Sequence, residues 1–315
     1  MRKVITILAA VAVMVVIGMG VAKWALDGDS SGTPQEPAAQ GPEQAQEETP
    51  EQPEWCPEVE VIAAPGTWES GAEDDPIHPH VNPLSFLLTV TNPLQERYPE
   101  DRVKVWTLPY TAQFRNVSAP MEMSYDDSRT QGTDRVRAEM METHQQCPGT
   151  DFVLTGFSQG AVIMGDLAEE LGGEQPFIPA ERVRGFALVA DGRRVADQGV
   201  AVGNPVSGVG AEVALQPLNA AVQPIVPGAT MRGPRSGFGV LNDRVSQICA
   251  PDDHICDAPR DVGNALGRAR DMISAGGVHA QYGTNPNVFP GTTTNQWLVE
   301  WASGLIDAPP ATPHP

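Results

Sequence analysis

The sequence predicts an α/β fold, a three-layer sandwich in which a central, mostly parallel sheet has helices on both faces. Short apolar runs with the composition of strands alternate along the chain with longer segments that have the period of helices, and this alternation is typical of parallel sheets. Hydrophobic residues make up 41% of the 315 residues, which is enough for a sizeable core. No repeat with a period of about 20–50 residues is visible.

The expected elements follow one another in order. We expect strands at 58–66, 102–110, 151–156 and 183–190, and helices at 84–97, 127–147, 159–171, 260–274 and 294–306. Pro93 should break or kink the first helix. The second should turn Val136, Met140 and Met141 inward. Residues 199–247, rich in Gly, Pro, Val and Ala, show little periodic pattern, and a connection of this length is usually functional or disordered.

The N-terminus indicates export. Arg2 and Lys3 precede residues 4–22, which carry no charge and are long enough to cross a bilayer. Signal peptides usually have a shorter apolar core, so we expect a retained signal anchor within residues 1–26. Small residues around Val21 leave cleavage, and therefore secretion, as the alternative. In either case the rest of the chain lies outside the cytoplasm.

Residues 27–54 contain acidic residues, Pro and Gln but no basic or aromatic residue, which predicts a disordered, extended linker. One folded domain should therefore occupy residues 55–315. The formal net charge of −20 argues against nucleic acid as a partner, because phosphates would be repelled, and it is equally compatible with a role in solubility alone.

All four cysteines lie after the export segment, in a context where disulfides persist. Four cysteines allow three pairings. The short spacing of Cys249 and Cys256 suggests a small closed loop, which leaves Cys56 to pair with Cys147. His254 lies between the two close cysteines, but no second histidine is near it, so we expect no metal site.

Residues 151–167, DFVLTGFSQGAVIMGDL, contain Gly-x-Ser-x-Gly between a strand-like and a helix-like segment. In α/β-hydrolases this motif is a tight elbow that exposes a nucleophilic serine. Gly156 and Gly160 leave room for the strand and the helix to fold against each other. The turn would present Ser158 at the carboxyl edge of the sheet, beside a helix N-terminus that favours an oxyanion.

A nucleophilic serine needs a base and an acid, in the chain order Ser, Asp, His. The histidines after Ser158 are His254, His279 and His314. We expect His279 to be the base, because His314 lies in the terminal tail and His254 lies inside the small disulfide loop. Spacing alone leaves several acids open, namely Asp191, Asp252, Asp253 and Asp257.

Linked motifs make this chain similar to the cutinase family. CAPDDHIC (249–256) has the form Cys-x-x-x-Asp-x-Ile-Cys, His279 and Tyr282 follow it, and Cys147 lies eleven residues before the serine of Gly-Phe-Ser-Gln-Gly. The resemblance covers roughly residues 55–306. Within the family, the chain most resembles the membrane-anchored cutinase-like phospholipases and thioesterases of mycobacteria and related actinobacteria.

The resemblance implies a triad of Ser158, Asp253 and His279, and it implies the same Cys56–Cys147 and Cys249–Cys256 pairing. It also implies an oxyanion hole built from Thr67, in APGTWESG (64–71), with the backbone N–H groups of Gln159 and of Thr67 itself. Alternatively, Thr67 only caps a turn. Fungal cutinases have a smaller residue at the position of Trp68, so the resemblance does not define the surroundings of the oxyanion hole.

The expected function is hydrolysis of lipid esters through an acyl-enzyme, without a cofactor or metal. Thioester hydrolysis and acyl transfer would use the same groups, and a non-catalytic envelope-binding protein on a hydrolase scaffold is an alternative from another class. Residues 199–247 could form an apolar cover that shelters long acyl chains, or could be a packed surface excursion.

Overall fold

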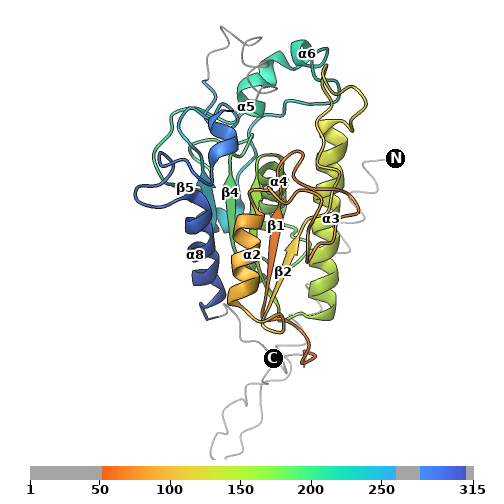
Figure 1. Cartoon of the computed structure of the whole chain (residues 1–315), viewed down its shortest axis with the longest axis vertical. Coiled ribbons are helices and arrows are strands. Elements are labelled where there is room, and N and C mark those ends of the chain that lie inside the picture. Colours follow the sequence, from red (N-terminus) through yellow and green to blue (C-terminus); the bar gives the residue numbers. More distant parts are fainter. Residues whose placement is uncertain (1–51, 260–276, 310–315) are drawn as a thin grey trace, which may run out of the picture. The chain divides into compact units, whose positions relative to one another are not determined.

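The computed structural model describes residues 52–259 and 277–309. In this part of the chain one six-stranded sheet has the order β2-β1-β3-β4-β6-β5, and all neighbouring strands are parallel (Figure 1). The strands are β1 (Val59–Ala64), β2 (Val103–Thr107), β3 (Asp151–Phe157), β4 (Val183–Val189), β5 (Val200–Val202) and β6 (Val245–Ile248). The predicted parallel α/β fold is confirmed.

Helices cover both faces of the sheet. They are α2 (Leu88–Arg97), α3 (Tyr125–Gln146), α4 (Gln159–Gly172), α5 (Ala211–Leu215), α6 (Asn219–Val222) and α8 (Thr294–Ile306). The predicted helix at 260–274 and the predicted anchor at 1–26 lie outside the described residues, as does most of the predicted linker. Among the described helices, none has the length and apolarity needed to cross a membrane.

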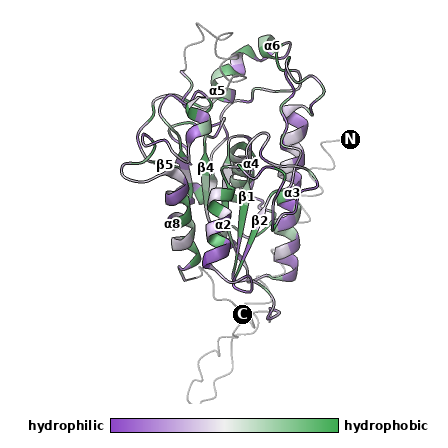
Figure 2. Cartoon of the chain, in the orientation of Figure 1, coloured by the Kyte–Doolittle hydropathy of each residue, from purple (hydrophilic) through white to green (hydrophobic). Residues whose placement is uncertain are grey.

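The alternation of side chains along β1 divides the core into two layers. Val61 packs with Leu94 of α2 and Leu298 of α8 in one hydrophobic cluster. Ile62 points to the other face and packs with α3 and with Ile163 of α4. Figure 2 shows the resulting pattern, in which hydrophobic strands lie between helices that carry hydrophilic residues. The sheet is therefore buried on both sides, as parallel sheets require.

Two details of the predicted helices are wrong. The first helix begins at Leu88 rather than at residue 84, and Pro93 does not break it, because a proline in the second turn removes only one backbone bond and the N–H of Tyr98 still reaches Leu94 O at 3.0 Å. On α3, Val136 and Met140 are fully buried, whereas Met141 is 48% exposed. Met141 lies one position beyond the buried face of that helix.

Residues 199–247 are more regular than their sequence suggests. They contain β5, most of β6 and the short helices α5 and α6, and β6 pairs with both β4 and β5. The four-residue strand β6 includes Ser246 and the buried Gln247, so its composition does not stand out as a core strand. Leu215, Val222 and Val226 are buried in a separate hydrophobic cluster with Tyr125 of α3.

Both expected disulfides are present. Cys56, just before β1, pairs with Cys147 at the end of α3, with a Cα–Cα distance of 5.5 Å. Cys249 pairs with Cys256 at 5.9 Å and closes the loop that follows β6. The first disulfide joins a strand to a helix across the amino edge of the sheet, and the second gives shape to a loop at the carboxyl edge.

Candidate active site

Ser158 lies in a sharp turn between β3 and α4. Its φ of 55° is in the left-handed region, which a non-glycine residue adopts only under strain. The Ser158 N–H donates to Val189 O of β4 at 2.9 Å, and this bond holds the turn against the sheet. A Cβ on Gly156 would overlap the backbone of Gly160, and one on Gly160 would overlap the backbone of Ala64 in β1. The two glycines are therefore required by close backbone approach, as the sequence predicted.

His279 lies in a short 3-10 turn, Val278–Gln281, which the chain brings next to the serine. Its Nε2 is 2.9 Å from Ser158 Oγ, and its Nδ1 is 2.9 Å from Asp253 Oδ2. The ring also stacks on Phe157, with centroids 5.1 Å apart. The structure thus brings together the three residues that the sequence singled out as a triad, with the imidazole between the hydroxyl and the carboxylate.

Asp253 is buried inside the loop closed by Cys249 and Cys256. Its Oδ1 accepts a bond from the Ile255 N–H at 3.0 Å, and its Oδ2 accepts one from the Tyr282 hydroxyl at 2.7 Å. Burial alone would raise the pKa of Asp253, but His279 and these hydrogen bonds outweigh it and hold the pKa below its usual value. The carboxylate is therefore ionised at neutral pH and suited to orient a histidine.

Two of the other candidate acids, Asp191 and Asp257, are engaged elsewhere. Asp191 is fully buried and forms an ion pair of 2.6 Å with Arg235. Asp257 accepts bonds from the backbone N–H groups of Gly208 at 2.6 Å and Asp252 at 3.1 Å. Of the acids that spacing left open, Asp253 is the one in contact with His279.

Thr67 and Gln159, the predicted oxyanion-hole residues, line the same cavity as Ser158. Gln159 is the first residue of α4, so its backbone N–H has no partner within the helix. Its side chain is held by two neighbours: Oε1 accepts from Ser128 Oγ at 3.1 Å, and Nε2 donates to Gln113 O at 3.3 Å. The backbone, rather than the side chain, of Gln159 is therefore available to an oxyanion.

The cavity in front of Ser158 has a volume of about 480 Å³. Its lining is mainly apolar and comes from the loop after β1, the start of α2, the region around the start of α3, the β3–α4 turn, Gly192, residues 211–231, the disulfide loop and residues 279–284. Apolar residues in the lining include Trp68, Leu84, Phe86, Phe114, Phe157, Val162, Met231 and Ile255. A cavity of this size and composition fits an apolar ligand with a polar reacting group.

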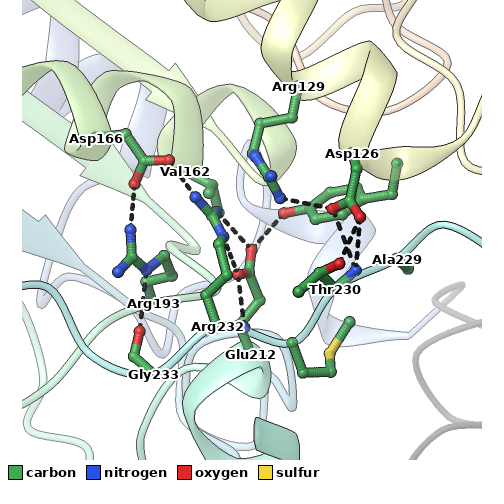
Figure 3. Close-up of polar contacts among 12 residues, drawn as sticks. Asp126, Arg129, Val162, Asp166, Arg193, Glu212, Ala229, Thr230, Arg232 and Gly233 are labelled. Carbon is green, nitrogen blue, oxygen red and sulfur yellow. Dashed lines mark hydrogen bonds and ion pairs between the residues drawn. The ribbon is translucent and has the colours of Figure 1, made fainter. Parts of the chain in front are cut away.

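Residues 211–235 form one wall of this cavity and are held by buried ion pairs (Figure 3). Asp166 of α4 lies 2.6 Å from Arg232 and 2.8 Å from Arg193, and Arg232 also lies 2.8 Å from Glu212. Burial would raise the pKa of Asp166, but three surrounding arginines outweigh it and lower the pKa. The region predicted as either an apolar cover or a packed excursion is thus packed and also lines the cavity.

The sequence did not identify Glu69, Glu212 or Tyr125 as cavity residues, and it indicated Tyr282 only as part of the family motif. Glu69 could have been noticed, since it follows Thr67 by two residues. Glu212 and Tyr125 are far apart in the sequence, and nothing in it indicates that the Tyr125 hydroxyl donates to Glu212 at 2.7 Å. In the described part of the chain, no group of three or more His, Cys, Asp or Glu residues could hold a metal ion.

The sequence profile of the Cutinase family matches residues 55–266. A protein of Corynebacterium glutamicum described as a carboxylesterase Culp6 homolog is 62% identical over 311 residues, which cover 98% of this chain and 99% of the relative. The chain belongs to the cutinase family. As a member of this family it has the α/β-hydrolase fold and is a serine carboxylic ester hydrolase.

Solved structures with a related arrangement are more distant in sequence. An acetyl xylan esterase is 19% identical, with a TM-score of 0.49 over 80% of this chain and 99% of that one. A cutinase-like protein from Cryptococcus sp. is 16% identical, with a TM-score of 0.46 over 81% of this chain and 98% of that one.

Proposed function

We propose that this protein is an exported carboxylesterase that hydrolyses the ester bonds of lipids at Ser158. Its membership of the cutinase family and the name of its corynebacterial relative support an ester substrate. The observation that carries the choice of a lipid is the apolar cavity that contains Ser158, because such a cavity binds an acyl chain better than a polar or polymeric substrate.

The rim of the cavity supports the same choice. Leu84 and Trp68, which both line the cavity, are 89% and 51% exposed. The Glu122 carboxylate accepts bonds from Nε1 of Trp68 at 3.0 and 3.1 Å. Large apolar side chains around the opening of an apolar cavity are suited to contact with lipid.

The reaction would proceed through an acyl-enzyme. As Ser158 Oγ bonds to the carbonyl carbon, its proton passes to His279 Nε2, and Asp253 stabilises the resulting imidazolium. The carbonyl oxygen becomes an oxyanion that accepts bonds from Thr67 and from the Gln159 N–H. The tetrahedral intermediate then collapses, the bond to the leaving alcohol breaks, and His279 returns the proton to that alcohol. Water repeats the sequence on the acyl-enzyme and releases the fatty acid.

Export and anchoring belong to the same proposal. The apolar run at residues 4–22 behind Arg2 and Lys3 supports a membrane anchor, and two disulfides support an oxidising compartment outside the cytoplasm. An enzyme held in this way acts on lipids of the cell envelope.

The test is a series of esters and thioesters from acetyl to palmitoyl, assayed with the purified full chain and with Ser158→Ala. The proposal predicts turnover of long-chain esters that disappears in Ser158→Ala. If only thioesters are turned over, the substrate is a thioester and not an ester. If the acyl group passes to an added alcohol in place of water, the protein is an acyltransferase. Binding of lipid without any turnover would instead support a non-catalytic envelope-binding protein.

A further inference from the structure

Glu69 closes the turn that carries Thr67. The Glu69 N–H donates to Gly66 O at 3.0 Å, and the Gly66 N–H donates back to Glu69 Oε2 at 3.0 Å. Thr67 and Trp68 are the two central residues of this four-residue turn. The backbone and the side chain of one residue thus hold the turn from both ends.

The turn is strained at its second central residue. Trp68 has a φ of 63°, a value that turns normally reserve for glycine at this position. Such a conformation persists only where the surroundings enforce it. The Trp68 N–H donates to Ala112 O at 2.6 Å, and its carbonyl accepts a bond from Asn82 Nδ2 at 3.0 Å. Glu69 completes this set of restraints from the cavity side.

The same carboxylate joins the turn to the segment before α2. Glu69 Oε1 accepts from the Phe86 N–H at 3.0 Å, and Oε2 also accepts from Ser85 Oγ at 3.3 Å. Phe86 in turn packs on Phe157, the residue before Ser158, with ring centroids 5.1 Å apart. Glu69 therefore connects the predicted oxyanion donor to the backbone around the nucleophile.

Three donors converge on this carboxylate, so its ionised form fits the site best. Burial raises the pKa of Glu69, and this outweighs the lowering by the bonds from Phe86, Gly66 and Ser85 and by the charge of His279. The titratable groups His279 and Tyr110 interact electrostatically with Glu69. Loss of the charge would weaken these bonds, because a neutral carboxyl group is a poorer acceptor than a carboxylate.

We propose that Glu69 is a positioning residue for ester hydrolysis, which holds the strained turn so that Thr67 faces the oxyanion. This inference rests on the proposed function, in which Thr67 donates to the oxyanion. The function can hold without it, because Thr67 could keep its place through the bonds to Trp68 alone.

The first test is Glu69→Gln in the full chain, assayed on a soluble butyryl ester. The amide turns an N–H toward one of the three donors, so the turn should loosen. We expect kcat to fall about 10–100-fold, less than the 10²–10³-fold typical of a removed oxyanion donor, with KM and melting temperature nearly unchanged. The matched control is Glu58→Gln, which removes an exposed carboxylate one residue before the start of β1. This variant should leave kcat unchanged. A kcat of Glu69→Gln within twofold of the unmutated value overturns the proposal.

A double-mutant cycle with Thr67→Val separates positioning from a general structural effect. If Glu69 acts through Thr67, Glu69→Gln should slow the Thr67→Val protein by less than twofold. If the two losses multiply, Glu69 does not act through Thr67, and the proposal is wrong.

The pH profile provides a test that does not depend on the folding of Glu69→Gln. Ser85→Ala removes a hydrogen bond that lowers the pKa of Glu69, so this pKa should rise and the kcat of Ser85→Ala should fall relative to that of the unmutated chain as the pH is lowered. A ratio of the two kcat values that does not change with pH overturns the proposal. If the unmutated chain turns over no ester, the proposed function fails and this inference fails with it. If the unmutated chain is active and Glu69→Gln leaves kcat unchanged, only the role of Glu69 is excluded.

Discussion

The hydroxyl of Tyr282 donates a hydrogen bond of 2.7 Å to Asp253 Oδ2, the same oxygen that lies 2.9 Å from Nδ1 of His279. This hydroxyl also accepts a bond of 2.9 Å from the Ala250 N–H, at the start of the disulfide loop. One buried phenol therefore links the segment that carries the histidine to the loop that carries the acid. Tyr282 is placed to control both the orientation and the ionisation of Asp253.

Tyr282→Phe should lower kcat about tenfold, because a hydrogen bond to a charged group contributes about 1.5 kcal/mol. That bond also lowers the pKa of Asp253, so its loss raises this pKa. Steady-state kinetics on a soluble ester would measure the loss of kcat. Tyr98→Phe is the matched control, since its hydroxyl bonds Asp307 far from the site. A Tyr282→Phe enzyme with unchanged kinetics would show that the phenol is only structural.

Met231 should limit the length of the acyl chain, because its side chain lines the cavity and is almost fully buried. Met231→Phe places a bulkier, stiffer group there. We expect palmitoyl ester hydrolysis to fall at least several-fold while butyryl ester hydrolysis changes little. Val240→Phe, at an exposed position of the same region, is the control. Equal losses on both esters in Met231→Phe would exclude a role in chain-length selection.

The ion pairs of Figure 3 should be essential for stability. Asp166→Asn leaves Arg193, Arg232 and Arg235 short of a partner, and breaking a buried pair typically costs about 3–5 kcal/mol. Asp134→Asn removes a more exposed carboxylate that pairs with Arg137 on α3, and it should cost less than about 1 kcal/mol. Denaturant unfolding compares the two variants. Similar costs for both would mean that the buried network does not anchor residues 211–235.

Glu60 should make the protein less stable at alkaline pH. Burial raises its pKa to about 8, against the opposing charge of Lys104, which lies 3.0 Å away. Between pH 4.5 and about 8 the folded chain keeps a proton that the unfolded chain has lost, so the free energy of unfolding falls as pH rises through this window. Glu60→Gln should remove this slope, and Glu58→Gln should retain it. Parallel stability profiles for the unmutated protein and Glu60→Gln would contradict the account.

Local sequence patterns were sufficient to predict much of the fold. β3 and α4 are strongly apolar, and the glycines between them have a steric reason that the structure bears out. β6 was missed because it has four residues and a buried glutamine, so its strand character comes from pairing with β4 rather than from its own composition. Short strands of this kind depend on contacts distant in sequence.

The site was predictable only in part, for a related reason. Spacing left Asp191, Asp252, Asp253 and Asp257 open as acids, because all four lie between Ser158 and His279 in the chain. Contacts between distant segments decide between Asp191 and Asp253: Arg235 neutralises Asp191, whereas Asp253 contacts His279. The roles suggested here for Glu69 and Tyr282 likewise rest on hydrogen bonds between separate segments, which a single sequence does not reveal.

The most direct test of the central claim is the intact mass of the full chain before and after reaction with a fluorophosphonate probe, measured beside Ser158→Ala. The probe reacts with a serine that a base has activated. We predict a single adduct on the unmutated protein and none on Ser158→Ala. An unmutated protein that stays unlabelled even in detergent, or a Ser158→Ala protein that still gains the adduct, would contradict Ser158 as the nucleophile.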